Sequence, residues 1–258
     1  MLQPGWNFDQ IDAASHGDAS AKFAAMAGYR LTEPFTSAAE AMLAALPPTG
    51  VIVDVGPGNG EDADALSAAG YTVIGVDVRT DLVTPAGWEL RKGCAADLPV
   101  ADASADVVWA NRVLHHLPSS ADLFTSGRRV LRAGGKMIVT WPDRSKFTCS
   151  EASVTPMMRR YLTTVRPDSA NPVTARQVEG QMVMAGLTVT STQFSRRRYH
   201  GAEAIGYPLP VHSDVLLERA LAALGPRDGP TLAAFVNALR AGTGWVDLSL
   251  ATVIAVSS

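Results

Sequence analysis

The chain has 258 residues, of which 47% are apolar and 18% are charged, and this composition excludes a disordered tail. The length suffices for one large α/β domain, or two small ones, with a buried core. The formal net charge of −3 provides no overall electrostatic attraction for DNA or RNA. The two cysteines, Cys94 and Cys149, are too few for a disulfide scaffold and too isolated for a zinc site, so we predict no metal.

The first residues, MLQPGWNFDQID, lack the basic and apolar regions of a signal peptide. No uncharged apolar window of about 18 residues occurs, so we expect no membrane span. Two isolated cysteines fit a reducing compartment. We therefore expect a cytoplasmic protein with no nucleic-acid partner.

The hydrophobic pattern changes its period repeatedly along the chain, and these changes define the predicted elements. Residues 19–46 indicate helices with a break near Glu33 and Pro34, and residues 47–50 (PPTG) end them. Helices are next predicted at 60–70 and 119–135. Buried strands are predicted at 51–55, 71–78, 88–93, 105–111 and 136–141. This alternation indicates right-handed crossovers and a parallel sheet with helices on both faces.

The second half of the chain departs from this rhythm. Residues 143–186 predict two helices around the segment RPDSANP, inserted after the fifth strand. A sixth strand is predicted at 187–194 and a seventh at 246–256, with helices at about 213–224 and 230–241 between them.

The stretch VIVDVGPGNG at 51–60 ends in three glycines two residues apart, Gly56, Gly58 and Gly60. After the first strand of a parallel sheet, such a loop lies in the ligand crevice, where its backbone approaches a ligand closely. Asp77 ends the second strand, 21 residues after Gly56, where a carboxylate can accept both hydroxyls of a ribose. These features predict an adenosine-type ligand; the alternative is a tight turn with a surface Asp. A dehydrogenase is disfavoured because its loop has the spacing G-x-G-x-x-G.

At this point the residues resemble the class I S-adenosylmethionine-dependent methyltransferases, in which an acid such as Asp54 precedes the loop. The resemblance covers roughly residues 50–141 and is closest to small-molecule enzymes similar to those of ubiquinone and menaquinone biosynthesis and of antibiotic tailoring. It rests on five motifs: VDVGPGNG (53–60), GVDV (75–78), GCAADLPV (93–100), ADVVWANRVLHHL (105–117) and VLRAGGKMIV (130–139).

The resemblance implies a Rossmann-like α/β fold, with a seven-stranded, mostly parallel sheet whose last strand is antiparallel. Residues 1–258 then form a single methyltransferase domain with a helical lid and a helical insertion. Its expected parts are an N-terminal helical cap (1–48), a cofactor-binding core (50–142), a helical insertion over the acceptor site (143–186) and C-terminal strands and helices (187–258).

The resemblance also assigns roles around the cofactor, S-adenosylmethionine, and its product form S-adenosylhomocysteine. Asp54 would organise the loop, Asp77 would hold the ribose and Val78 would pack on the adenine. Cys94 stands where the family usually has an acid that contacts the adenine amine, which leaves the backbone N–H of Ala95 for the ring nitrogen. The predicted cofactor-binding set is Asp54, Gly56, Pro57, Gly58, Gly60, Asp77, Val78, Cys94, Ala95, Ala96 and Asn111.

Two histidines, His115 and His116, follow the fourth strand at the mouth of the crevice. The ordinary pKa of histidine, about 6.5, suits a base that removes a proton from the acceptor near neutral pH. His116 is our first candidate and His115 the second. The alternative is a structural histidine, with catalysis by alignment alone.

Four further side chains are candidate acceptor contacts. Trp141 ends the fifth strand, where it suits a flat, apolar or cationic acceptor, although plain core packing is the alternative. Tyr29 belongs to the expected lid and Met158 to the insertion. Arg198 closes a run of three arginines that leaves the sixth strand, and would meet an acceptor carboxylate or phosphate unless it is a solvated strand end.

We therefore predict methyl transfer to an O, N or C atom of a small molecule, and the Ala-rich composition suggests bacterial secondary metabolism. One alternative is an S-adenosylmethionine-binding protein that does not methylate. Another is an RNA-base methyltransferase, which would need a basic stripe or an RNA-binding module. A homodimer through the N-terminal helices or the last two strands is left open.

Overall fold

The computed structural model describes residues 31–162, 173–205 and 214–258. Tyr29 and residues 1–30 of the expected helical cap lie outside these ranges. The described part of the cap, residues 31–48, contains helix α3 (Phe35–Ala44).

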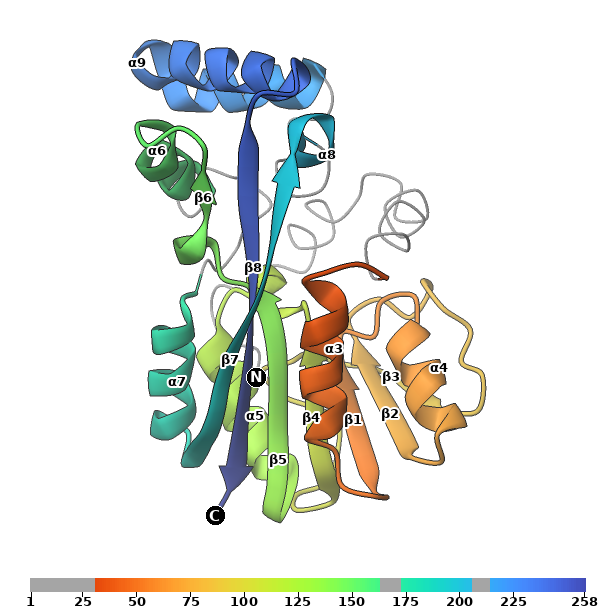
Figure 1. Cartoon of the computed structure of the whole chain (residues 1–258). Helices are drawn as coiled ribbons and strands as arrows, with labels where there is room; N and C mark the ends of the chain where they lie inside the picture. Colours follow the sequence, from red (N-terminus) through yellow and green to blue (C-terminus); the bar gives the residue numbers. More distant parts are fainter. Residues whose placement is uncertain (1–30, 163–172, 206–213) are drawn as a thin grey trace.

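A mixed sheet forms the centre of the molecule, with the strand order β3-β2-β1-β4-β5-β8 and with β7 on the outer side of β8 (Figure 1). Five neighbouring strands are parallel: β3 (Glu89–Lys92), β2 (Thr72–Asp77), β1 (Val51–Val55), β4 (Ala105–Asn111) and β5 (Leu131–Pro142). β8 (Trp245–Ser257) is antiparallel to both β5 and β7 (Leu187–His200). The predicted mostly parallel sheet with an antiparallel last strand is confirmed.

The described sheet has eight strands rather than the predicted seven. The additional strand, β6 (Thr148–Cys149), pairs with Asp247 and Val246 of β8. β7 pairs along the whole of one edge of β8. On the other edge, the pairing with β5 stops at Leu250, and β6 pairs with part of the remainder of that edge. A two-residue strand carries no period that a sequence pattern could reveal.

Side chains alternate between the two faces of the sheet, and each face is covered by its own helices. Val53 and Val108 pack with α5 (Ser120–Val130) and α7 (Ala175–Met184) on one face. Ile52 and Val107 pack on the other face with α3 and α4 (Glu61–Ala68). The prediction of helices on both faces is thus confirmed. The helix predicted at 119–135 ends earlier, at Val130, because Leu131 already pairs with Ala105 in the sheet.

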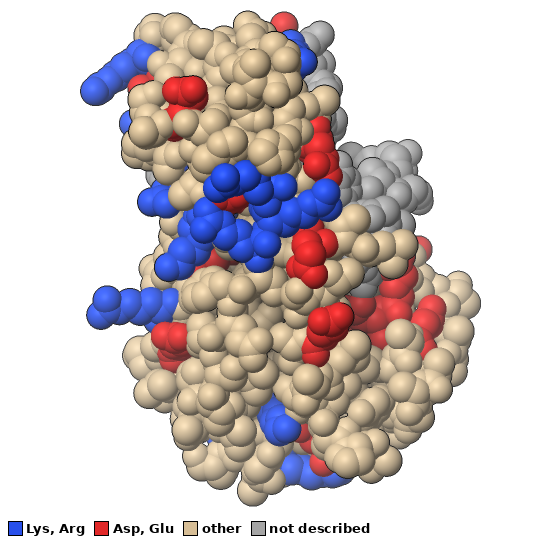
Figure 2. All heavy atoms as spheres, in the orientation of Figure 1, with Lys and Arg blue, Asp and Glu red and all other residues tan. Residues whose placement is uncertain are grey.

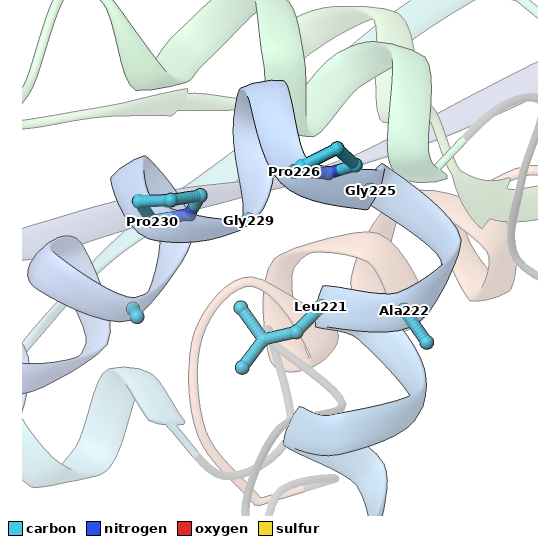
Figure 3. Close-up of a pocket in the computed structure, with 7 residues that line it drawn as sticks. Leu221, Ala222, Gly225, Pro226, Gly229 and Pro230 are labelled. Atoms are coloured by element: carbon cyan, nitrogen blue, oxygen red, sulfur yellow. The ribbon is translucent and has the colours of Figure 1, made fainter.

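A second helical layer stands beyond the carboxyl ends of the parallel strands, at the top of Figure 1. It consists of α6 (Val154–Arg160), α8 (Gly201–Ile205) and α9 (Asp214–Arg240), which pack around the extended ends of β7 and β8. Gly225 interrupts α9 with a non-helical backbone, so the two helices predicted at 213–224 and 230–241 are present. An apolar pocket of about 550 Å³, open to solvent, lies between the two halves of α9 and is lined by seven residues of that helix (Figure 3).

The predicted insertion, 143–186, is divided between the two layers. After a short 3₁₀ turn, η2 (Arg144–Lys146), α6 packs with α9. α7 instead packs beside α5 through Val178 and Met182, as an ordinary crossover helix of the sheet. Of the two helices, only α6 belongs to the layer beyond the strand ends, so any cover of an acceptor by this insertion is expected from α6.

The prediction that the sixth strand ends at Phe194 is wrong, because β7 continues through the three arginines to His200. Asp247 of β8, 1% exposed, explains the extension. Its carboxylate accepts hydrogen bonds from Arg196, from Arg198 at 3.0 Å and from Thr148 at 2.9 Å. Figure 2 shows the band of basic side chains that results across the middle of this face.

Replacing Asp247 with Asn is expected to destabilise the protein by about 1–2 kcal/mol, since hydrogen bonds to charged groups contribute about 1.5–3 kcal/mol but the two arginines are half exposed. Burial opposes ionisation of Asp247, but Arg198 and Arg196 outweigh it and lower its pKa. This contribution is therefore present at neutral pH and is lost as pH falls through the lowered pKa. Urea unfolding at pH 7 measures the effect. The more exposed pair of Glu203 with Arg197 provides the control: Glu203→Gln should cost less, and an equal cost would refute the account.

Candidate functional site

The glycine loop joins β1 to α4 at the carboxyl end of the sheet. Gly56, Gly58 and Gly60 all have left-handed backbones, with φ of 71°, 60° and 82°. The Gly56 N–H donates to the Val76 carbonyl at 2.9 Å, which ties the loop to β2. Pro57 is buried against Gly75 on the same side. The three left-handed glycines leave three of the five loop positions without a side chain, so a ligand can lie directly on the backbone there.

Asp77 ends β2 beside this loop and is partly buried. Its carboxylate accepts the N–H of Arg79 at 2.9 Å and those of Gly58 and Val78. Burial raises the pKa of Asp77, and these backbone hydrogen bonds oppose the rise. The two acids expected at the crevice thus differ in depth, since Asp54 is 2% exposed within β1 while Asp77 lies at the rim.

Asp62, which the sequence analysis did not single out, connects the loop helix to β4. It lies in the first turn of α4, where its carboxylate accepts from Asn111 Nδ2 at 2.6 Å and from Trp109 Nε1 at 3.3 Å. Asn111 thereby acquires a fixed orientation at the end of β4. An acid in the first turn of the helix was the available signal, but helix N-termini favour acids generally, so it was not specific.

The segment after β3 places Cys94 and Ala95 in the core, each 6% exposed. The Cys94 sulfur accepts the N–H of Ala96 at 3.4 Å, and burial raises the pKa of the thiol. Asp97 is exposed, and its Oδ1 lies 3.6 Å from Nη2 of Arg129. The sulfur thus takes a turn-forming hydrogen bond at the place where the resembled family has an acid.

His115 and His116 form the 3₁₀ turn η1 (Leu114–His116) directly after β4. Their ring centroids lie 4.0 Å apart, and both side chains are partly buried. The His116 N–H donates to the Val113 carbonyl at 2.8 Å. The pair therefore occupies the predicted place, at the carboxyl end of the strand next to the glycine loop.

The structure does not bring the predicted acceptor contacts into one group. Trp141 is 1% exposed in the main core, where its Nε1 donates to the Val173 carbonyl at 2.9 Å. Met158 belongs to α6 and is fully buried in the cluster that α6 forms with α9. The guanidinium carbon of Arg198 lies 3.5 Å from the ring centroid of Trp245, and the side chain forms an ion pair with Asp247. Tyr29 lies outside the described residues, so contact of these four with an acceptor remains a prediction.

The described residues contain neither a metal-binding cluster nor a membrane-spanning helix. Within them, no group of three or more His, Cys, Asp or Glu side chains could hold a metal ion. No helix in the described ranges has the length and apolar character that crossing a membrane requires.

Comparisons with known proteins agree with this geometry. Residues 53–139 match a family model described as a methyltransferase domain. The 27-O-demethylrifamycin SV methyltransferase of Amycolatopsis mediterranei is 34% identical over 98 residues, which are 33% of this chain and 36% of that protein. The aligned part spans 36% to 52% of the length of three curated relatives that the chain matches.

Solved structures extend the likeness in fold beyond the matched domain. The YcgJ protein of Bacillus subtilis has a TM-score of 0.64 at 15% identity, over 86% of this chain and 98% of that one. The cyclase SpnF has a TM-score of 0.52 at 18% identity, over 86% of this chain and 79% of that one. Residues 53–139, which carry the glycine loop, Asp77 and the two histidines, therefore match an S-adenosylmethionine-dependent methyltransferase domain, and the fold around them is shared by the solved structures.

Proposed function

We propose that the protein transfers a methyl group from S-adenosylmethionine to an O, N or C atom of a small molecule. The observation that carries this proposal is the pairing of three left-handed glycines with the carboxylate of Asp77 at the ends of β1 and β2. The residues fit the cofactor: the loop leaves bare backbone for the methionine portion, and Asp77 can accept hydrogen bonds from the ribose hydroxyls. Val78, Cys94, Ala95 and Ala96 would then surround the adenine.

When bound, the cofactor supplies a methyl group on a positively charged sulfur. The transfer is an in-line displacement, so the protein mainly has to align the acceptor and keep water out. Asp62 would contribute by fixing Asn111 beside the loop. α6 and the N-terminal cap are the segments that we expect to cover the acceptor.

An O–H or N–H acceptor must also lose a proton, and His116 is our first candidate for the base. Replacing His116 with Ala should lower kcat by roughly 10²–10⁴, the usual contribution of general-base catalysis, and leave S-adenosylhomocysteine affinity unchanged. His115→Ala tests the second candidate. His200→Ala is the control that should change neither quantity, because His200 is an exposed residue at the end of β7. Full activity in both single variants would leave catalysis to alignment alone.

The name of the Amycolatopsis relative supports a small-molecule acceptor, and it is consistent with a role in bacterial secondary metabolism. We also propose a cytoplasmic location, because both described cysteines are free thiols. The fold alone does not decide between methylation and another reaction, since a cyclase shares it. The cofactor-binding protein without methylation therefore stays the second candidate.

The test is a calorimetric titration of the purified protein with S-adenosylmethionine, S-adenosylhomocysteine and NAD. Binding of the first two, followed by a mass gain of one methyl in an acceptor screen, is the expected result. Binding of NAD instead, or of none of the three, would refute the assignment of the glycine loop. Cofactor binding with no transfer to any acceptor would favour the second candidate.

A further inference from the structure

Arg112 has an unusual backbone immediately after β4. Its φ is 61°, in the left-handed region that side chains other than Gly, Asn and Asp seldom adopt. Its N–H donates to the Thr140 carbonyl of β5 at 2.7 Å, and this hydrogen bond holds the residue where β4 ends beside β5. Strain of this kind persists only where the surrounding structure imposes it, and it often marks a functional position.

The side chain of Arg112 is also unusual. Its guanidinium lies 5.6 Å from the ring centroid of Phe35, at the start of α3. Its Nη1 is buried, and no hydrogen-bond partner for it exists within the described part of the chain. The arginines of β7 differ, since Arg196, Arg197 and Arg198 each pair with a carboxylate. A buried cationic donor without an acceptor costs free energy, and an anionic ligand would supply that acceptor.

The position of Arg112 separates it from the groups assigned to the cofactor. The glycine loop and Asp77 follow β1 and β2, whereas Arg112 lies one strand further, where β4 meets β5. It is three residues before His115 and adjoins Val113, whose side chain faces Gly56. A group held by Arg112 would therefore be bound at the segment that carries the histidines, at the end of a different strand from the ribose-binding Asp77.

We propose that Arg112 binds an anionic group, a carboxylate or a phosphate, of the methyl acceptor. This inference rests on the proposed function, because it assigns the acceptor to the same crevice. The planar guanidinium suits two parallel hydrogen bonds to either group, and the Phe35 ring would hold its orientation by cation–π contact. The acceptor would then be an acid or a phosphate ester that presents its reacting atom toward His115 and His116.

The test variant is Arg112→Asn, because Asn tolerates the left-handed backbone and removes the guanidinium. Its matched control is Ala103→Asn, at the other described non-glycine residue with a positive φ, 47°. Both variants should keep or raise Tm, whereas loss of a structural arginine would lower it. Arg112→Lys keeps the charge without the planar fork and should bind anions with intermediate affinity.

Inorganic phosphate and acetate are titrated, at constant ionic strength, into the free protein and into its S-adenosylhomocysteine complex. We expect saturable binding of at least one anion, weakened tenfold or more by Arg112→Asn and unchanged by Ala103→Asn. Equal binding by the wild type and Arg112→Asn would overturn the inference, as would the absence of anion binding in a wild type that binds S-adenosylhomocysteine. Failure of the wild type to bind S-adenosylhomocysteine would instead refute the proposed function.

One competing source of the anion is the carboxylate of the cofactor itself. Affinities for S-adenosylhomocysteine and for 5′-methylthioadenosine, which lacks that carboxylate, distinguish the two. If Arg112 serves the acceptor, Arg112→Asn leaves both affinities unchanged. A tenfold loss confined to S-adenosylhomocysteine would overturn the inference and assign Arg112 to the cofactor.

Discussion

Asp77→Asn is expected to weaken S-adenosylhomocysteine binding by roughly 100-fold or more, since two hydrogen bonds to a charged carboxylate contribute about 1.5–3 kcal/mol each. The Asn carbonyl still accepts one hydrogen bond but presents an amide donor at the other position, where the ribose hydroxyl also donates. Calorimetric titration measures the change in Kd. Asp81→Asn is the matched control, because Asp81 lies four residues further along the chain, is mostly exposed and forms an ion pair with Arg79.

The pH dependence of binding provides an independent check on Asp77. Burial raises the pKa of this carboxyl in the free protein, so it takes up a proton at a higher pH than an ordinary Asp. Because the ribose requires the ionised form, affinity should fall as pH drops through the raised pKa. The Asn variant has no such group and should show no such fall. A pH profile identical in both proteins would contradict the assignment.

The stability of the cofactor-free protein should depend on the ionisation of Asp77 in the opposite direction to cofactor affinity. An acid with a raised pKa binds more protons in the folded than in the unfolded state between the two pKa values, so stability falls as pH rises through that window. At neutral pH the ionised carboxylate therefore costs stability, and Asp77→Asn should leave the cofactor-free protein as stable or more stable. A large loss of Tm would indicate a structural role instead.

The parallel half of the sheet was predictable because its signals are local. Buried parallel strands need no polar alternation, and runs such as VIVDV and ADVVWAN contain the β-branched and aromatic residues that such strands favour. The glycine loop was predictable for the same reason, since its left-handed backbone requires glycine at each of three positions. The choice of Asp77 as the ribose-binding acid then followed from its position 21 residues after Gly56, at the end of the second strand.

The errors arose where a distant residue decides the structure. The arginines of β7 suggest a strand end, yet Asp247, about 50 residues away, neutralises two of them and keeps them within the strand. Trp141 suggests either an acceptor contact or core packing, and the Val173 carbonyl that accepts from its indole is 32 residues away, so the sequence pattern does not reveal it. Arg112 was missed because neither a left-handed φ nor a buried donor without a partner has a sequence signature.

Gly56→Ala is expected to lower both stability and cofactor affinity, because its φ is 71° and a Cβ there would lie 2.6 Å from Val113 Cγ2. The left-handed backbone alone costs a non-glycine residue about 1–2 kcal/mol. The overlap adds to this cost, and it forces Val113 to move at the segment that carries Arg112 and the two histidines. We therefore expect a loss of S-adenosylhomocysteine affinity of roughly tenfold or more, since each 1.4 kcal/mol is a factor of ten.

Gly134→Ala separates the two causes, because Gly134 has a similar φ of 75° but open space where its Cβ would be. It should lose stability through backbone strain alone and bind the cofactor normally. Adding Val113→Ala to Gly56→Ala removes the overlap and should recover part of the lost stability, while the strain remains. Equal losses of Tm in the two glycine variants, with unchanged affinity in both, would mean that the loop backbone does not lie against the ligand. In that case the site would have to be sought elsewhere at the carboxyl edge of the sheet.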